Sequence, residues 1–114
     1  MDKARQNFKA EVELSKRFIN ECTIPTVSIQ IKQGYYRTSY SYKHAVENYF
    51  CTYISNDAFI QAAKELNIRS KPTENGNNRY FAIKLNEKKF RSGIEKNEWQ
   101  GVRVTAFERL NDLS

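Results

Sequence analysis

The chain has 114 residues, of which 39% are hydrophobic and 13% aromatic, a composition that excludes a disordered polar chain and fits one globular domain. Nineteen Lys and Arg against 13 Asp and Glu give a formal net charge of +6, which attracts polyanions such as nucleic acid. No apolar run approaches the ~20 residues needed to cross a bilayer, and the chain starts without an apolar signal region, so we expect a cytoplasmic protein.

The first predicted element is a helix over residues 2–22. Apolar side chains recur along it at three- and four-residue spacing, with Ser15 among them: Phe8, Val12, Ile19 and Cys22. Asp2 suits the positive end of the helix dipole. Pro25 ends the helix, because the residue before a proline is pushed out of the helical conformation.

Two strands are predicted next. Val27, Ile29 and Ile31 alternate with polar residues over 26–32, which is typical of a half-buried strand. Gln33-Gly34 supplies a turn, and residues 35–42 are rich in Tyr and Thr, which favour strands. We therefore expect residues 35–42 to pair back as a second strand.

Two helices are predicted over about 42–52 and 56–67. The inner face of the first would hold Ala45, Val46, Tyr49 and Phe50, and that of the second Phe59, Ile60, Ala63 and Leu66. Ser55 is a favourable N-cap for the second helix, and Asn67 is a suitable stop.

The rest of the chain predicts a β-hairpin and a last strand. Residues 68–71 and 79–85 flank an Asn-Gly turn, with Phe81, Ile83 and Leu85 pointing inward. A basic connection at 88–91 leads to a strand over 102–106 and a frayed turn over 108–114. The predicted order is α-β-β-α-α-β-β-β, with a possible terminal helix, in a single α+β domain whose antiparallel sheet carries a two-helix insertion and a β-hairpin.

The most distinctive segment runs from Tyr35 to Lys43 and holds four of the seven tyrosines. Tyrosine rings stack on bases, while Arg and Lys neutralise phosphates. The same residue types suit a protein interface, and alternate tyrosines of a strand could simply pack on the core. We expect these side chains to contact the partner: Tyr35, Tyr36, Arg37, Tyr40 and Lys43.

A second candidate surface is the hairpin with its basic flank. Over residues 79–91 only Glu87 offsets the basic residues Arg79, Lys84, Lys88, Lys89 and Arg91. Two helices followed by a hairpin resemble a winged helix, whose wing contacts the DNA backbone. The second of these helices would be the one that reads DNA bases. However, its exposed side chains carry almost no net charge, with Asp57 and Glu65 beside Lys64, so base-specific recognition is not expected. A solvated charged hairpin is the alternative interpretation.

Catalysis has weaker support in the sequence. His44 is the only histidine and could act as a general base near Tyr40, Ser41 or Cys51, but the sequence strongly favours a partly buried or surface histidine at a helix start. Cys22 and Cys51 are interpreted as free thiols. One His and two separated Cys are too few for a metal site. We therefore expect no enzyme, no metal, no cofactor and no small-molecule substrate.

In size and composition the chain resembles small accessory proteins of phages and mobile elements, a population that includes anti-CRISPR proteins. The resemblance extends over the whole chain, which is short and rich in Lys, Asn and Tyr, and it assigns no functional residue. The sequence predicts a non-catalytic protein that binds DNA or RNA through its Tyr, Arg and Lys side chains. The alternative is a protein-binding inhibitor of a host enzyme that handles nucleic acid.

Overall fold

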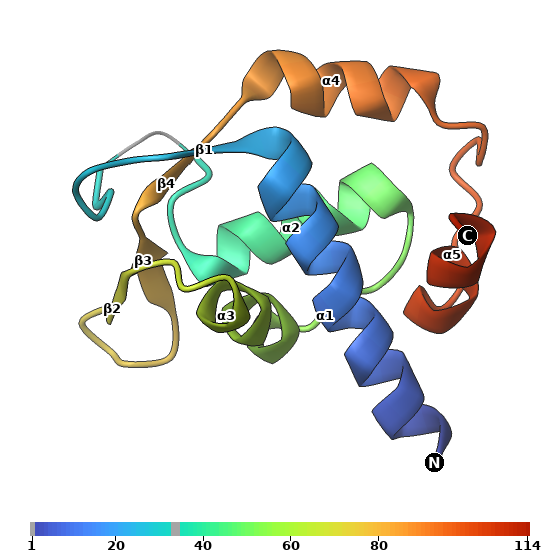
Figure 1. Cartoon of the computed structure of the whole chain (residues 1–114), viewed down its shortest axis with the longest axis horizontal. Helices are drawn as coiled ribbons and strands as arrows, with labels where there is room; N and C mark the ends of the chain where they lie inside the picture. The colour runs from blue at the N-terminus through green and yellow to red at the C-terminus, as the bar shows by residue number, and fades with distance from the viewer. Residues whose placement is uncertain (1, 33–34) are drawn as a thin grey trace.

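The computed structural model describes residues 2–32 and 35–114 (Figure 1). In that part of the chain five helices and two two-stranded antiparallel sheets form an α+β fold, which confirms the predicted class. The order is α-β-α-α-β-β-β-α-α, so the predicted order is wrong. The elements are α1 (Lys3–Cys22), β1 (Thr23–Pro25), α2 (Ser39–Phe50), α3 (Asn56–Glu65), β2 (Ser70–Pro72), β3 (Arg79–Phe81), β4 (Ile83–Leu85), α4 (Glu87–Lys96) and α5 (Ala106–Asp112). The predicted turn at Gln33-Gly34 lies outside the described residues.

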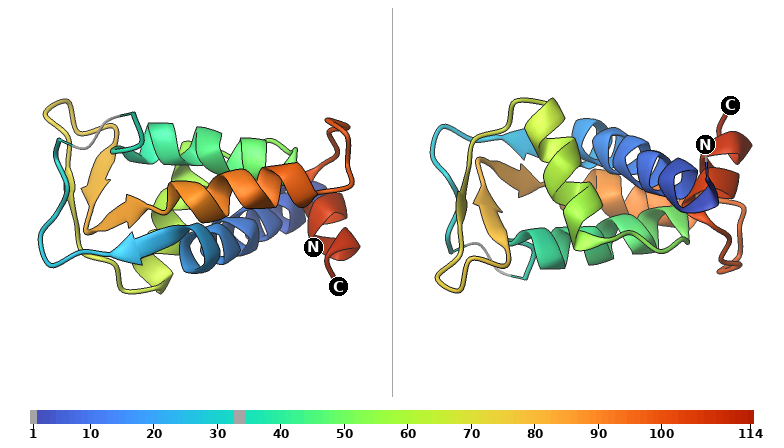
Figure 2. Two further views of the ribbon diagram at one scale, coloured as in Figure 1. Left: turned by 90° about the horizontal axis from the view of Figure 1, so that it is seen from above. Right: turned by 90° about the horizontal axis from the view of Figure 1, so that it is seen from below.

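The helices surround the core, and the strands gather at one end (Figure 2). Helices α1 and α2 flank the core, α4 covers it on one side and α3 on the other. Helix α5 lies at the end opposite the strands, beside the start of α1, where the backbone N–H of Phe107 donates to Asn7 Oδ1 at 3.0 Å. The surface at the strand end is therefore built from loops and the hairpin rather than from helix faces.

Helix α1 confirms the prediction for residues 2–22. Asp2 caps it by accepting a hydrogen bond from the backbone N–H of Arg5 at 2.8 Å. The predicted inner positions Val12, Ser15, Ile19 and Cys22 are buried, whereas Phe8 is exposed. Across the described part of the chain, α1 included, no helix is both long enough and apolar enough to cross a membrane.

The predicted strand over 35–42 is wrong, because helix α2 begins within it. Thr38 caps α2 by accepting a hydrogen bond from the Ser41 N–H at 3.4 Å, and the Tyr42 N–H donates to the Thr38 carbonyl at 2.9 Å. This helical turn sends the Tyr42 ring into the core, where it stacks on Phe59 with ring centroids 5.4 Å apart. The helix predicted over 42–52 is confirmed but starts three residues earlier, at Ser39.

Helix α3 confirms the prediction over 56–67, with its end at Glu65. Ser55 caps it, accepting from the Ala58 N–H at 3.1 Å. Asn67 has a φ of 59°, a left-handed conformation that Asn tolerates better than most residues, and it turns the chain away from the helix. The predicted helix stop at Asn67 is therefore explained by the left-handed backbone conformation of this residue.

The hairpin is confirmed in a shorter form. Strands β2 and β3 pair antiparallel, with Lys71 opposite Tyr80. The chain then bends at Ala82, and β4 leaves the hairpin to pair with β1, placing Lys84 opposite Ile24. The backbone of Ala82 joins the two sheets, since its N–H donates to the Arg69 carbonyl and its carbonyl accepts from the Thr26 N–H, both at 2.9 Å.

Three further strand or loop predictions are wrong. Residues 26–32 form no strand, because the Thr26 hydroxyl and the Gln30 side-chain amide both donate to the Ser28 carbonyl and fold the segment locally. The basic connection at 88–91 belongs to helix α4, which Asn86 caps. Over 102–106 only Val104 makes an isolated bridge, to Thr52. Thr105 then caps α5, so the possible terminal helix is confirmed in place of the frayed turn over 108–114.

Candidate nucleic-acid interface

The nine predicted binding residues come from four places in the fold, the segment before α2, helix α2, strand β4 and helix α4. Tyr35 is 70% exposed and meets the neighbouring Tyr36 ring edge-on, with centroids 4.9 Å apart. Tyr36 itself packs on the core against Phe90 of α4, at 5.8 Å. Burial raises the pKa of the Tyr36 hydroxyl above its ordinary value. Of this pair, Tyr35 is exposed and Tyr36 is partly buried.

Tyr40 and Lys43 lie elsewhere, in a cluster on α2. The Lys43 ammonium is buried beside the Tyr53 ring, 4.9 Å from its centroid, and lies 3.2 Å from Glu47 Oε1. His44 Nδ1 lies 3.0 Å from the same oxygen, and both contacts are at ion-pair distance but outside hydrogen-bond geometry. Tyr40 is half exposed and edge-on to His44. The Lys43 charge is thus paired inside the protein, while the Tyr40 ring stays accessible.

The basic flank of the hairpin forms a third location. Lys84 is exposed on β4, and Lys88, Lys89 and Arg91 are exposed on α4. Arg91 lies 3.7 Å from Glu87 across one helical turn, in a solvent-exposed pair that contributes little to stability. Lys84 therefore faces solvent from β4 and the other three cations from α4, and none of the four lines a groove described below.

Arg37 borders a groove on one face of the β2–β3 hairpin, which we call the hairpin groove. It has a volume of about 520 Å³. Its lining residues are Ile31, Lys32, Arg37, Thr73, Glu74, Asn75, Asn78 and Tyr80. Tyr80 and its cross-strand partner Lys71 lie on the same hairpin face, since directly paired residues share a side of the sheet. The groove therefore combines cations with a tyrosine ring and amide side chains, with Glu74 as its one acid among the described residues.

A second groove, the basic groove, lies beside the other face of the hairpin. It has a volume of about 560 Å³ and is lined by Ile60, Lys64, Asn67, Ile68, Arg69, Ser70 and Arg79. Lys64, Arg69 and Arg79 come from three different segments, and none of the described lining residues is acidic. Within residues 2–32 and 35–114, these three cations take part in no ion pair. Their charges remain available to an anionic ligand.

Local structure positions the cations of the basic groove. The N–H groups of Asn67 and Ile68 donate to the carbonyls of Lys64 and Ala63, both at 3.0 Å, which fixes the turn between Lys64 and Arg69 and satisfies carbonyls at the end of α3. Arg79 Nε donates to Ser70 Oγ across the hairpin at 2.7 Å. One edge of the Arg79 guanidinium is thereby held by protein, while its terminal nitrogens donate to no other group among the described residues.

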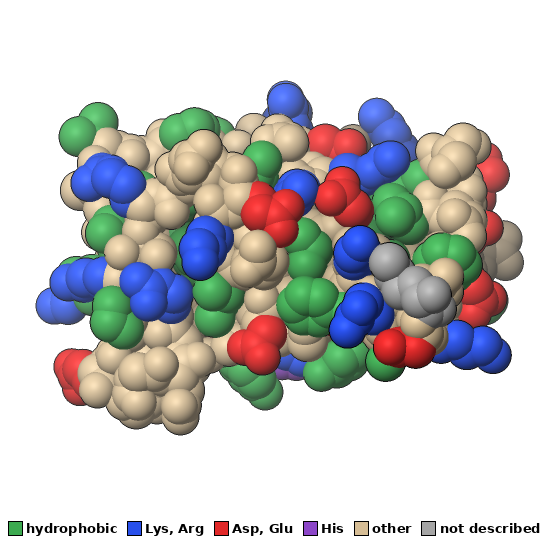
Figure 3. Space-filling model, turned by 60° about the horizontal axis from the view of Figure 1, so that its bottom comes forward, with side chains coloured by type: hydrophobic (Ala, Val, Ile, Leu, Met, Phe, Trp, Pro, Cys, Tyr) green, Lys and Arg blue, Asp and Glu red, His purple; other side chains and the backbone are tan. Residues whose placement is uncertain are grey.

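The space-filling view agrees with this distribution of charge. Lys and Arg side chains are spread over the whole of this face, whereas most acidic side chains lie over the helices, so the cations at the end that carries the strands have few acidic neighbours (Figure 3). Sequence reasoning missed Arg69 and Lys71 and assigned Lys64 only to a neutral helix. A signal was present, because Glu74 is the one acid against four basic residues between Leu66 and Asn86.

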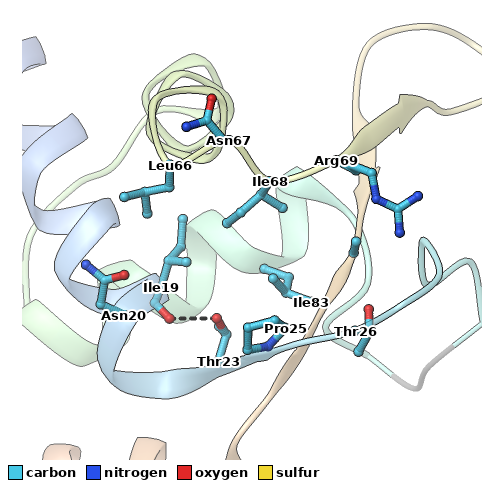
Figure 4. Close-up of a pocket in the computed structure, with 11 residues that line it drawn as sticks. Ile19, Asn20, Thr23, Pro25, Thr26, Leu66, Asn67, Ile68, Arg69 and Ile83 are labelled. Carbon is cyan, nitrogen blue, oxygen red and sulfur yellow. Dashed lines mark hydrogen bonds between the residues drawn. The ribbon is translucent and has the colours of Figure 1, made fainter.

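An apolar pocket of about 390 Å³ adjoins the basic groove and shares Asn67, Ile68 and Arg69 with it (Figure 4). Ile19, Ile68 and Ile83 converge on this space from α1, the loop after α3, and β4. Thr23 lies at its edge with its hydroxyl donating to the Ile19 carbonyl at 2.6 Å. The complete lining is Ile19, Asn20, Thr23, Pro25, Thr26, Leu66, Asn67, Ile68, Arg69, Ala82 and Ile83.

Other kinds of site and other proteins give no competing assignment. In the described part of the chain, no group of three His, Cys, Asp or Glu side chains is placed to hold a metal ion. Cys22 and Cys51 are both free thiols. No protein-family model matches the chain, and comparisons with curated proteins and with solved structures gave no match.

Proposed function

We propose that the protein is a non-catalytic nucleic-acid-binding protein that contacts the phosphate backbone around its β2–β3 hairpin. The observation that carries the proposal is the basic groove, where Lys64, Arg69 and Arg79 converge on a space without an acidic lining residue in the described chain. Arginine supplies a planar fork of donors that fits phosphate oxygens, and lysine adds a compact positive charge.

The hairpin groove extends the same chemistry to the other hairpin face. Lys32 and Arg37 line it, and Lys71 stands on the same face opposite Tyr80. Asn and Tyr side chains also hydrogen-bond phosphate and sugar oxygens. A hairpin with cations on both faces can insert along a nucleic-acid backbone, as the wing of a winged helix does.

Recognition would be largely independent of sequence. The exposed positions of α3 carry both signs of charge, with Asp57 and Glu65 against Lys64, and Glu65 is itself 2.5 Å from Lys16. A helix that reads base edges in the major groove presents Arg, Lys, Asn or Gln instead. The affinity is therefore assigned to phosphate contacts, which carry no sequence information.

Direct binding measurements test this proposal. Fluorescence anisotropy at low salt, with labelled DNA and RNA in single- and double-stranded form, should detect binding by the folded protein. Arg79→Ala and Lys64→Ala should each weaken binding by roughly fivefold for every sequence, because each removes a phosphate contact. Lys9→Ala is the matched control, since Lys9 is an exposed cation on α1 that lines neither groove.

Two results would count against it. The proposal fails if no DNA or RNA binds at low salt, or if Lys9→Ala weakens binding as much as Arg79→Ala does. Circular dichroism of each variant ensures that a loss of affinity does not come from a loss of folding.

A protein-binding inhibitor is the second candidate function, and one observation favours it. Exposed apolar and aromatic side chains accumulate in the segment between β1 and α2, where Val27 is 94% and Tyr35 70% exposed. Such side chains are typical anchors of protein interfaces. Pull-down from a nuclease-treated host lysate should then recover one stoichiometric protein, and Val27→Asp should abolish its recovery. Retention of the partner by Val27→Asp would rule out this surface.

A further inference from the structure

The apolar pocket and the basic groove are adjacent and share part of their lining, which makes them the apolar half and the basic half of a two-part recess. Asn67, Ile68 and Arg69 line both halves, so a ligand could occupy the two at once. The basic half holds Lys64 and Arg79, which the apolar half lacks. A molecule that fills the recess therefore carries an anionic group next to a compact apolar body.

The apolar half has a hydrophobic floor and a polar rim. Side chains of Ile19, Leu66 and Ile83 face the space, and Asn20 and Asn67 stand at its margins (Figure 4). Neither of these two side-chain amides makes a hydrogen bond within the described residues. The floor can accept the face of a flat ring, and the two amides can donate to and accept from polar ring edges.

Arg69 lies on the boundary between the two halves. One of its terminal nitrogens, Nη2, donates to the carbonyl of Val27, which holds the side chain against the loop after β1. Its remaining guanidinium donors are not engaged within the described chain, so they can contact a phosphate at the mouth of the apolar half.

We infer that the apolar pocket holds one unpaired base of a single-stranded nucleic acid whose adjacent phosphate lies in the basic groove. The inference rests on the proposed function and specifies its substrate class. A pocket of about 390 Å³ lies in the range of small-molecule sites. Bases in a duplex are stacked and paired, and only a single strand or an extruded nucleotide can deliver a base into a pocket of this kind.

The test compares three ligands of equal length: a single-stranded oligonucleotide, the same strand with abasic sites, and the matching duplex. DNA and RNA versions of the single strand are both measured. The intact single strand should bind roughly 5- to 100-fold more tightly than the abasic strand, because only the former fills the pocket. The duplex should bind with an affinity close to that of the abasic strand, through phosphate contacts alone.

Two variants locate the effect in the pocket. Ala82→Leu places a larger side chain in the apolar pocket and leaves the basic groove unchanged, since Ala82 lines only the former. It should remove the preference for the intact single strand and preserve duplex affinity. If Ala82→Leu does not fold, Leu66→Ala decides the question, because the partly buried Leu66 also lines the apolar pocket alone. Leu110→Ala is the matched control, because Leu110 of α5 is also partly buried but does not line the apolar pocket.

The outcomes separate the inference from the proposed function. Equal affinity for all three ligands, or a single-strand preference that survives both pocket variants, would overturn the inference and leave phosphate binding intact. Absence of binding to every ligand at low salt would overturn both. A preference lost in Ala82→Leu or reduced in Leu66→Ala, and retained in Leu110→Ala, supports the base-binding pocket.

Discussion

Arg109 is a cation that serves the interior of the protein. It is only 2% exposed and donates from Nε to the Phe50 carbonyl and from Nη2 to the Val102 carbonyl, both at 2.7 Å. Its guanidinium also stacks on Trp99, 4.1 Å from the ring centroid, and pairs with Asp112 at 3.0 Å. The side chain thus joins α5 to the end of α2 and to the loop between α4 and α5.

Arg109→Ala should lower the free energy of unfolding by about 3 kcal/mol, because two backbone carbonyls lose their donor and the Trp99 ring loses its partner. Urea unfolding followed by circular dichroism measures the change. Arg103→Ala removes an exposed Arg that has no ion pair in the described chain and should change stability by less than about 0.5 kcal/mol. Equal unfolding midpoints for the two variants would contradict the role of Arg109.

Cys22 gives the stability a dependence on alkaline pH. The side chain is fully buried, and burial raises the pKa of its thiol from 9.0 to about 11. The unfolded chain loses this proton at a lower pH than the folded chain, so unfolding becomes more favourable as pH rises from 9 to 11. The free energy of unfolding should fall by roughly 1.4 kcal/mol per pH unit at most from this group.

Urea unfolding between pH 8 and pH 11 measures that slope, and Cys22→Ala is its control. The neighbouring Tyr49 hydroxyl, whose pKa burial also raises, should leave a residual slope in the variant. The same slope in both proteins would contradict the assignment to Cys22.

Individual side chains illustrate what the sequence could and could not predict. Tyr36 and Lys43 belong to an acid-poor, tyrosine-rich segment, and composition alone marks both as binding residues. Their actual partners are Phe90 and Glu47, one from a distant helix and the other one turn along α2. The first contact depends on tertiary packing, whereas the second is an (i, i+4) pair inside the helix predicted over 42–52 and could have been anticipated from it.

Helix α4 is held to the body of the protein by an aromatic cluster that leaves no room at Gly93. The Tyr49 ring packs near Phe18, Phe50 and Phe90, and a Cβ at Gly93 would lie 2.2 Å from Tyr49 Cε1. The Tyr49 hydroxyl is also fixed, because it donates to Glu21 Oε2 at 3.1 Å.

Gly93→Ala should therefore destabilise the protein by about 1–3 kcal/mol through steric overlap. Helix propensity alone predicts the opposite result, since it favours Ala over Gly by about 1 kcal/mol in a helix interior. Thermal unfolding of Gly93→Ala against wild type measures it, with Glu95→Ala on the exposed side of α4 as control. A higher midpoint for Gly93→Ala would show that the ring moves aside freely.

At the level of whole elements, the sequence predicted helices better than strands. Helices α1, α2 and α3 follow from spacing, caps and stops, which are all local signals. Strand β1 has three residues, and its partner β4 lies about 60 positions later, so no local pattern identifies it. Helix α4 was missed because its run of lysines hides an inner face with Phe90 as its one fully buried residue. The excess of Lys and Arg over acidic residues could place cations near the hairpin. The grooves that these cations line form only when distant segments pack together, which the sequence does not reveal.

For the molecule as a whole, the excess of positive charge is unevenly distributed. On the face seen in Figure 3, Lys and Arg side chains occur throughout, while acidic side chains concentrate over the helices, so the cations near the hairpin have fewer acidic neighbours. Such an arrangement orients a polyanion toward one end of the protein and makes association sensitive to salt. The salt dependence of binding therefore reports how many groove cations contact phosphates.

The most direct measurement is the slope of log affinity against log salt for a single-stranded oligonucleotide. Wild type is compared with a triple variant of the basic groove, Lys64→Ala, Arg69→Ala and Arg79→Ala. The control triple variant, Lys3→Ala, Arg5→Ala and Lys9→Ala, removes the same net charge from the exposed start of α1. Loss of three phosphate contacts should make the slope shallower by about 2–3 in the groove variant, whereas the control should keep the wild-type slope. Equal slopes for the two triple variants would contradict phosphate binding in the basic groove.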